Sequence, residues 1–525
     1  MRHLRLALVG LIITVLSLLS PWVAPANAAT GYSLTAVAAA GGTTTSATAI
    51  KLTVRFTYNG KAVKRATALL QYARGSAWVT EKKVSIRSGK GTVTVKHGVG
   101  DRTYRFRVSG KATSAQFTVH FVPASLTVSG SGRGHGVGMS QYGAYQLARD
   151  LGWSAEQILE YYYPGAKVGA ANNNTRTIKV QVLGPPSDSR TTTKLSITSG
   201  GFTVTDGTTT LATTAAKKPI TVGVAGAKVT AKVTLANGKA ARTLSAARLL
   251  FRWSGSATVS VAGAQGTYRY GNLQATVIGK RPNVVNELRM NTEYLYGIDE
   301  MPSSWGSSAG RGLEALKAQV IAARSYVITR ALRWNPSPGG VDARCDCQVF
   351  DDSRSQNFTG WKKAGGAGSA EWRRAVDQTL TSTTVQVVRP TASATTEIAE
   401  TPYFASSGSY SAGGITYSGT VSNADAFGTT AIAYLSHADD PYSVRAPGNP
   451  YGAWTVKVSQ SRAEGLFSIG KLRSVQVTQR YAGGLVQEMT ATSVTGATKA
   501  VTRTSEGWRI ALGLPGAWVS GITGR

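Results

Sequence analysis

Short runs of alternating apolar and polar residues constrain the fold of this chain most. About seven such runs lie between Ser33 and Pro123, separated by glycines and polar turns; Ile50-Lys-Leu-Thr-Val-Arg-Phe56 is one. A period of two places successive side chains on opposite faces of a strand. We therefore predict an immunoglobulin-like β-sandwich over residues 29–124, with no cysteine pair to hold it. Because this region also has no cluster of titratable residues that could do chemistry, we expect it to serve as a spacer or binding module.

The remaining chain, residues 125–525, is predicted to mix strands with a few helices. Residues 171–280 are strand-like, rich in threonine, valine and glycine, and residues 125–170 hold two short helices. Ser154 and Gln157 have the spacing of a capping box for the second of these helices, which Tyr163-Pro-Gly ends. The fold class is therefore mainly β with a few helices, and residues 281–525 form the last part of the larger domain.

One long helix is predicted from about Leu313 to Leu332. At 100° per residue its apolar side chains share one arc, which also contains Arg324, and Lys317 lies about 20° from that arginine. A buried guanidinium without a partner costs several kcal/mol, so Arg324 must meet a carboxylate or another polar group. Two other roles for Arg324 remain open: a structural ion pair, or a side chain at the edge of the apolar stripe whose charged end reaches solvent.

The first 28 residues have the pattern of a secretory signal peptide. Arg2 and Arg5 flank an apolar run, Leu6 to Leu19, and Ala26-Asn-Ala28 fits a cleavage site. A retained anchor is the alternative, although a membrane helix needs about 20 apolar residues. We expect a secreted protein of the cell wall or cell surface.

The chain is strongly basic. Its 58 lysines and arginines against 26 acidic residues give a net charge of +32, which favours anionic surfaces as neighbours. The positive residues are scattered and no nucleic-acid recognition motif is present, so nucleic acid is not expected as a partner. Anionic wall polymers fit an exported chain better, and solubility alone is the other interpretation.

Several motifs beyond residue 125 resemble the SpoIID family, which is named for stage II sporulation protein D and includes amidase-enhancer proteins. The stretch from Asn286 to Pro302 resembles the family's "YL.GV...EMP", and Leu313-Glu-Ala-Leu-Lys-Ala-Gln-Val-Ile-Ala-Ala-Arg-Ser-Tyr326 resembles "LEALKAQAVAARTYA". Four shorter matches agree: Tyr268 to Leu273, Ala405 to Gly408, Tyr434 to Tyr442 and Arg509 to Leu514. The resemblance spans roughly Ser125 to Val519.

The order of the motifs departs from the family. The glycine-histidine motif, Gly134 to Gln141, precedes the catalytic stretch by over 150 residues, whereas in the family it follows it. The order therefore looks circularly permuted, which a fold tolerates where its termini lie close together. In that case His135 and Glu300 should lie on one cleft.

Glu300 matches the family's catalytic glutamate, and the resemblance implies a lytic transglycosylase acting on peptidoglycan glycan strands. Such an enzyme needs one carboxyl group, because the sugar's own C6 hydroxyl replaces the water that an ordinary glycosidase must activate. The acid must be protonated near neutral pH, which an apolar pocket favours. Leu295, Tyr296 and Met301 are the predicted walls of that pocket. A glutamate that merely starts a helix is the alternative.

The resemblance also implies substrate-binding residues along a groove. Alternate glycines from Gly132 to Gly138 let backbone approach a sugar chain closely, although a purely structural turn remains open. Their spacing is not that of a dinucleotide or phosphate-binding loop. The predicted groove residues are His135, Ser140, Gln141, Tyr142, Lys317, Arg324, Ser406 and Ser407.

Cys345 and Cys347 resemble a region that holds zinc in some members of the family. No histidine lies between His135 and His437, so the set of four ligands is incomplete, and a strained disulfide and two free thiols are the other possibilities. We expect no cofactor and an activity that survives chelation. The rival functions are a non-catalytic wall-binding protein that stimulates a cell-wall amidase, and a structural wall protein.

Overall fold

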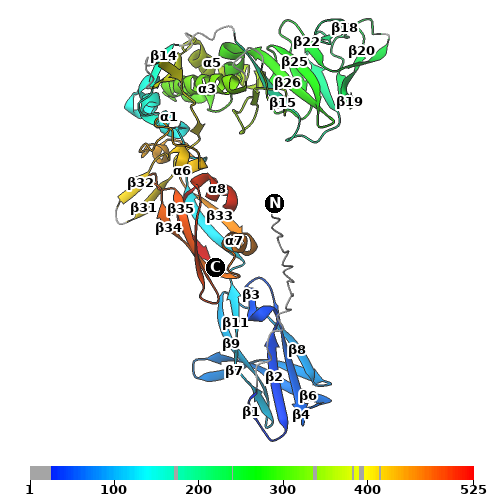
Figure 1. The fold of residues 1–525 in the computed structure, drawn as a ribbon, viewed down its shortest axis with the longest axis vertical. Coiled ribbons are helices and arrows are strands. Elements are labelled where there is room, and N and C mark those ends of the chain that lie inside the picture. Colours follow the sequence, from blue (N-terminus) through cyan, green and yellow to red (C-terminus); the bar gives the residue numbers. More distant parts are fainter. Residues whose placement is uncertain are drawn as a thin grey trace, which may run out of the picture.

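The computed structural model describes residues 25–170, 176–238, 240–334, 340–380, 383–389, 395–412 and 415–524. The molecule is elongated, with the N-terminal strands at one end and helix α3 (Leu313–Trp334) with its neighbouring sheets at the other (Figure 1). Most of the predicted signal peptide, residues 1–24, lies outside the described residues. Cleavage near Ala28 therefore stays a prediction.

The N-terminal end is built from strands, as the alternating pattern predicts. The hydrogen-bonded path runs β1-β10-β9-β6-β7-β8-β4-β2, and β3, β5 and β11 pair beside it. Their inward side chains, among them Leu52, Phe56 and Phe106, form a core of their own. The immunoglobulin-like topology itself stays a prediction. The strands are β1 (Pro25–Ala28), β2 (Tyr32–Ala38), β3 (Thr43–Thr45), β4 (Ile50–Tyr58), β5 (Lys61–Ala62), β6 (Arg65–Arg74), β7 (Ala77–Arg87), β8 (Lys90–Val95), β9 (Gly100–Val108), β10 (Ala112–Ser114) and β11 (Phe117–Val122).

The next strand belongs to a module that the C-terminal residues complete. Strand β12 (Ser125–Ser131) lies between β33 (Trp454–Ser459) and β37 (Trp518–Gly524), with Leu126 opposite Gly524. The two ends of the region 125–525 are therefore neighbours, which is the geometry that a circular permutation requires. The module also contains β34 (Leu472–Arg480), β35 (Val486–Ser493), β36 (Thr498–Thr502), α7 (Gln460–Phe467) and α8 (Ser505–Leu512).

Two sheets carry the strand-like region after residue 176. One has the order β18-β17-β22-β25-β26-β15-β27 and the other β21-β20-β19-β16-β23-β24. Their strands are β15 (Thr177–Leu183), β16 (Thr193–Ile197), β17 (Thr203–Thr205), β18 (Thr210–Thr213), β19 (Ile220–Ala225), β20 (Lys228–Thr234), β21 (Ala241–Ala246), β22 (Leu249–Arg252), β23 (Val259–Val261), β24 (Thr267–Tyr268), β25 (Asn272–Ile278), β26 (Arg281–Arg289) and β27 (Val349–Phe350).

The predicted helices are present. Helices α1 (Gln141–Leu151) and α2 (Ala155–Tyr162) precede the sheets, and both hydrogen bonds of the capping box form between Ser154 and Gln157. The long helix α3 contacts α1, α2 and α5 (Ser369–Asp377) and is buried nearly all round from Ala315 to Ile328. The predicted arc is buried apart from Leu313, which is partly exposed. Burial also extends to the other faces, because α3 is the centre of this part of the molecule and not a helix on its surface.

Smaller elements connect these parts. They are β13 (Met139–Ser140), β14 (Lys167–Ala170), β28 (Thr383–Arg389), β29 (Thr395–Ile398), β30 (Tyr403–Phe404), β31 (Ser409–Ala412), β32 (Ile415–Ser418), α4 (Trp361–Ala364) and α6 (Asn423–Phe427). Within the described ranges, no helix combines the length and the apolar character needed to cross a bilayer.

Candidate functional site

A cleft of about 1260 Å³ brings together segments that are far apart in the sequence. Its lining comes from the glycine-histidine motif, the stretch around Glu300, helix α3, strand β30, helix α6 and helix α8. His135, Gln141 and Glu300 therefore lie on one cleft despite the altered order of the motifs. The residues that the following paragraphs use are Arg133, His135, Gln141, Glu300, Tyr326, Arg330, Arg354, Glu400, Tyr403, Phe404, Phe427, Glu506 and Arg509.

Two hydrogen-bond donors contact one oxygen, Oε1, of the Glu300 carboxyl group. The backbone N–H of Asn357 donates to Oε1 at 2.7 Å, and the hydroxyl of Tyr403 donates to the same oxygen at 3.3 Å. An oxygen that accepts two hydrogen bonds is a poor place for a proton. When Glu300 is neutral, its proton therefore belongs on Oε2.

The pKa of Glu300 is raised above its usual value. Removal of water by the surrounding protein is the main cause, and hydrogen bonds from Asn357, Gln141 and Tyr403 oppose it. The neighbouring Asp299, whose carboxylate pairs with Lys363 at 2.9 Å, adds less to the rise than desolvation does. The site thus favours a neutral acid by partial burial and not by repulsion between two carboxylates.

A chain of hydrogen bonds behind Glu300 fixes the direction of these contacts. Tyr294 donates to Oε1 of Gln356 at 2.7 Å, and Nε2 of Gln356 donates to the Tyr403 hydroxyl at 2.9 Å and to the Ala323 carbonyl at 3.3 Å. Since the Tyr403 oxygen accepts from Gln356, its own hydrogen is free to point at Glu300. Sequence motifs did not point to Gln356, Asn357 or Tyr403, which lie 56 to 103 residues beyond Glu300.

His135 is a neutral part of the cleft wall. Its Nδ1 accepts a hydrogen bond from the backbone N–H of Val137 at 3.0 Å, and the ring also bonds the backbone of Tyr403. Desolvation lowers the pKa of His135 to about 4, and its ring lies between those of Phe404 and Phe427, with centroids 5.6 and 5.5 Å away. Both nitrogens are engaged within the protein, so His135 shapes the loop more than it offers a free hydrogen bond to a substrate.

Two further carboxylates line the cleft, and both are held in ion pairs. Glu400 meets Arg330 at 2.9 Å, and Glu506 meets Arg509 at 2.5 Å. Among the described residues of the lining, Glu300 is thus the one carboxyl group outside an ion pair. Glu300 is therefore available as acid and base at one position. A second carboxylate outside an ion pair is absent from the described residues of the lining.

Six of the predicted groove residues do not line the cleft. The Ser140 hydroxyl is buried, where it caps α1 and contacts Ser443. Tyr142 packs on Trp305, with ring centroids 5.0 Å apart, and Lys317 pairs with Glu314 at 2.6 Å. Arg324 is fully buried and donates to Thr379 at 3.2 Å.

The Thr379 hydroxyl is one partner of Arg324, and burial lowers the pKa of the guanidinium to about 10. Its neighbours on α3, Tyr326 and Arg330, face the cleft in its place. The prediction that Arg324 reaches the groove was therefore wrong, because its position on the helix turns it into the core.

Ser406 and Ser407 are also fully buried. The Ser406 hydroxyl donates to the Ser407 carbonyl at 2.9 Å and accepts from Asn449 at 2.9 Å, and the Ser407 N–H donates to Ser140 at 3.2 Å. These serines hold the segment after β30 against the glycine-histidine loop. They position the groove and do not line it.

The predicted apolar wall is likewise elsewhere. Leu295 and Met301 are buried in the core, and Tyr296 contacts Asp377. The ring in contact with Glu300 is that of Tyr403, and Tyr326 and Phe404 line the same cleft. Residues close to Glu300 in sequence therefore support its backbone, while distant residues surround its carboxyl group.

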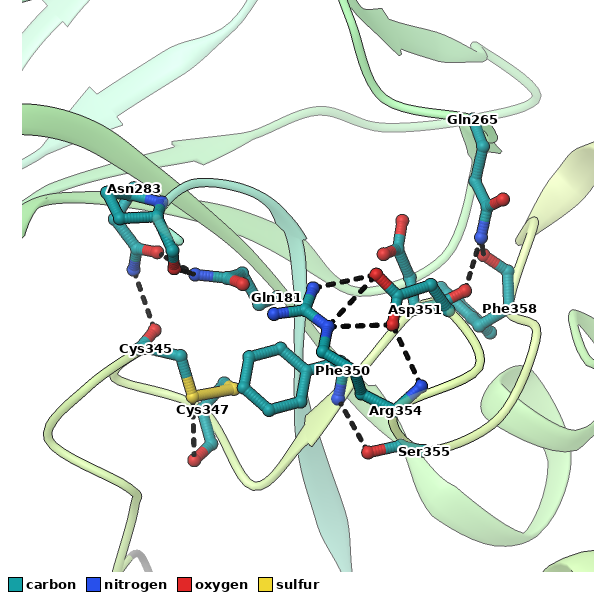
Figure 2. A network of polar contacts seen from close by, with 12 residues as sticks. Gln181, Gln265, Asn283, Cys345, Cys347, Phe350, Asp351, Arg354, Ser355 and Phe358 are labelled. Atoms are coloured by element: carbon teal, nitrogen blue, oxygen red, sulfur yellow. Dashed lines mark hydrogen bonds and ion pairs between the residues drawn. A yellow bond between two sulfur atoms is a disulfide. The ribbon is translucent and has the colours of Figure 1, made fainter. Parts of the chain in front are cut away.

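Cys345 and Cys347 form a disulfide (Figure 2). Of the three possibilities that the sequence left open, the structure has this one. Asn283 donates to the Cys345 carbonyl at 2.8 Å, and the following strand β27 pairs with β15. Strand β27 and the turn after it lie between the disulfide and Asn357, whose N–H donates to Glu300.

No metal site emerges from the described part of the chain, where no group of three or more His, Cys, Asp or Glu side chains could hold an ion. Asp351 is a buried carboxyl group directly after strand β27, which follows the disulfide in the sequence (Figure 2). Desolvation raises the pKa of Asp351 to about 7, with Asp352 adding to the rise and Arg354 opposing it. The independence of the activity from metal stays a prediction.

Comparison with known proteins identifies the region around Glu300. Residues 279–386 match the family described as SpoIID, stage II sporulation protein. This part of the chain belongs to the SpoIID family. The match includes Glu300 and α3 and leaves out the glycine-histidine motif.

Three curated proteins share short segments with this chain. An uncharacterized protein of Brachyspira hyodysenteriae is 32% identical over 102 residues, which is 19% of this chain and 27% of that protein. The amidase enhancer of Bacillus subtilis is 50% identical over 52 residues, 10% of this chain and 7% of that protein. Stage II sporulation protein D of Bacillus subtilis is 46% identical over 48 residues, 9% of this chain and 14% of that protein. The chain thus spans about a quarter or less of each relative.

Proposed function

We propose that this protein is a lytic transglycosylase that cleaves the glycan strands of peptidoglycan and leaves a terminal 1,6-anhydro sugar. The observation that carries the proposal is the state of Glu300, a carboxyl group with a raised pKa that lies in the cleft outside any ion pair. The SpoIID match and the resemblance of Glu300 to the family's catalytic glutamate support it. Export to the cell wall or cell surface, with cleavage near Ala28, is part of the proposal.

The reaction needs one group that gives a proton and then takes one back. Neutral Glu300 donates the proton on Oε2 to the glycosidic oxygen as the bond to the sugar's C1 breaks. The resulting carboxylate then removes the proton from the C6 hydroxyl of the same sugar, whose oxygen bonds to C1 and closes the anhydro ring. One proton leaves and one returns, so Glu300 ends in the form in which it began.

Asn357 and Tyr403 fit both halves of this cycle. Their hydrogen bonds to Oε1 strengthen when Glu300 becomes a carboxylate, which stabilises the charge that forms during bond cleavage. They also keep Oε1 turned away from the proton transfer, so that Oε2 is the oxygen that meets the substrate. Gln141, which hydrogen-bonds Glu300, joins this set from the glycine-histidine motif.

A hydrolase with two carboxyl groups fits the cleft less well. Such an enzyme needs a second carboxylate as base or nucleophile. Glu400 and Glu506 are neutralised by Arg330 and Arg509, and an ion-paired carboxylate is a weaker base than a free one. The substrate's own hydroxyl removes the need for that second group.

The test is digestion of intact and peptide-stripped peptidoglycan by the purified protein and by Glu300→Gln, with the products analysed by mass. The wild type should release fragments with terminal anhydro sugars, and Glu300→Gln should release none while it folds and binds the wall normally. Release by Glu300→Gln at the wild-type rate would show that Glu300 is not the acid.

A non-catalytic role as an enhancer of a cell-wall amidase is the second candidate. It is favoured by the segment of 50% identity with the protein named amidase enhancer. The same digestion with an added amidase separates the two functions. An enhancer would raise the release of free peptides equally with the wild type and with Glu300→Gln, and neither would form anhydro ends.

A further inference from the structure

The N-terminal sandwich is far more basic than the rest of the chain. Residues 29–124 contain fifteen lysines and arginines against two acidic residues, Glu81 and Asp101. Glu81 meets His97, and Asp101 meets His120 and Arg473. Both carboxylates thus have other partners, and the sandwich contains no further carboxylate to balance its surface.

Four of these cations form a row across four neighbouring strands. Arg65 on β6 is directly opposite Arg87 on β7, Arg87 is opposite Lys90 on β8, and Lys90 is opposite Arg55 on β4. All four side chains are exposed. Residues in register point to the same face of a sheet, and strands lie about 4.8 Å apart, so the row spans roughly 14 Å.

Hydroxyl groups form the next row on the same face. Two residues farther along each strand, Thr67 is opposite Ser85, and Thr53 is opposite Thr92. Two residues beyond them, three more cations are in register with the strands of this face: Lys51, Lys83 and Arg107. The face therefore alternates between rows of positive charge and a row of hydrogen-bond donors.

This arrangement is unfavourable for the sandwich alone. Like charges directly opposite each other on neighbouring strands destabilise a sheet. Three such pairs lie in one row, with no acidic residue between them. A polyanion laid across the strands would relieve this repulsion.

We propose that this face of the sandwich, defined by Arg55, Arg65, Arg87 and Lys90, binds a linear phosphodiester polymer of the cell wall. Three of the four cations are arginines, whose planar guanidinium groups bind phosphate through two hydrogen bonds at once. The hydroxyl row offers donors to the remaining phosphate oxygens. A straight row of charges across exposed strands fits a flexible chain with a repeating charge, which can follow the row from strand to strand.

The proposal concerns a surface separate from the cleft. The sandwich and α3 lie at opposite ends of the molecule (Figure 1), so the polymer would tether the enzyme and leave the glycan cleft open. The proposed polymer binding and the proposed glycan cleavage can be refuted independently, because polymer binding is measured without any cleavage reaction.

The experiment measures binding of the full mature chain to purified poly(glycerol phosphate) over a range of salt concentrations. The test variant is Arg65→Gln/Arg87→Gln/Lys90→Gln. The control variant is Lys218→Gln/Lys228→Gln/Lys232→Gln, which removes the same charge from exposed positions on a different part of the chain. Polyglutamate and duplex DNA are the comparison polymers.

The test variant should bind at least about tenfold more weakly, and its slope of log affinity against log salt should fall by about 2, at roughly 0.7 for each lost contact. The control should stay within about twofold of the wild type. Thermal unfolding of the test variant should be at or above the wild-type temperature, because repulsion is removed. Equal losses in the two variants would overturn the proposal in favour of diffuse charge, and equal or tighter binding of polyglutamate or DNA would overturn the assignment to a wall phosphodiester.

Discussion

Replacement of Tyr403 by phenylalanine tests how the protein sets the acidity of Glu300. The change removes the hydroxyl that donates to Oε1 at 3.3 Å and leaves the aromatic ring in place. A hydrogen bond to a charged group is worth about 1.5–3 kcal/mol, and this one is longer than the usual 2.7–2.8 Å, so the lower end applies. At 1.4 kcal/mol per unit, the pKa of Glu300 should rise by about one unit.

The same change has a cost in stability. Nε2 of the fully buried Gln356 loses the Tyr403 oxygen as an acceptor and keeps only the Ala323 carbonyl. An unsatisfied buried donor costs about 1–3 kcal/mol, which denaturant unfolding can measure. Tyr481→Phe is the matched control, because the Tyr481 hydroxyl donates to the backbone carbonyl of Arg503 at 3.2 Å, far from Glu300 in the sequence.

The assay is the pH dependence of kcat/KM for anhydro-sugar formation. Glu300 must be protonated to begin the reaction, so activity should fall as pH rises through its pKa, and Tyr403→Phe should move this alkaline limb up by about one unit. Tyr481→Phe should leave the limb in place. A Tyr403→Phe variant that loses stability as calculated but keeps the wild-type alkaline limb would refute the role of Tyr403 at Glu300.

Three further predictions concern pH and metal. Asp351 has a pKa of about 7 in the folded state against an ordinary value of 3.8, so the folded protein binds this proton more tightly. Stability is therefore lost as pH rises from 4 to 7. The variant Asp351→Asn should stabilise the protein at pH 8 by up to about 4 kcal/mol, measured by denaturant unfolding. No gain at pH 8 would contradict this. His135 affects stability in the opposite direction, because folding lowers its pKa from 6.5 to about 4. Its contribution to stability is complete above pH 6.5 and is lost as pH falls towards 4. The variant His135→Gln should therefore flatten the decline in stability between pH 6.5 and 4. A decline as steep as that of the wild type would argue against a neutral His135. Activity should survive EDTA, and a loss that zinc restores would overturn the expectation that no metal is needed.

Local features of the fold could be predicted because their causes are local. The alternation in residues such as Ile50 to Phe56 sets the faces of a strand, and the spacing of Ser154 and Gln157 sets a helix start. The burial of α3 on nearly every side could not be predicted in this way. It depends on α1, α2 and α5 packing around the helix, which its own periodicity does not record.

The site was predictable only in part. Glu300, His135 and Gln141 lie on the cleft, and all three come from motifs that resemble the SpoIID family. The same motifs also contain Ser140, Ser406 and Arg324, which support the groove from inside, because a family motif does not separate residues that contact a ligand from residues that hold the fold. Tyr403 and Gln356 had no motif at all, since a hydrogen bond across 47 or 103 residues leaves no local pattern.

The most direct test of the central claim, that Glu300 turns the sugar's own hydroxyl into the nucleophile, is digestion of glycan strands in water enriched in heavy oxygen. The mass of each newly formed end reports which oxygen attacked C1. A lytic transglycosylase predicts ends that lack one water molecule and contain no solvent oxygen, formed by the wild type and not by Glu300→Gln. Heavy oxygen at the new ends would mean that water attacked, and would contradict the mechanism.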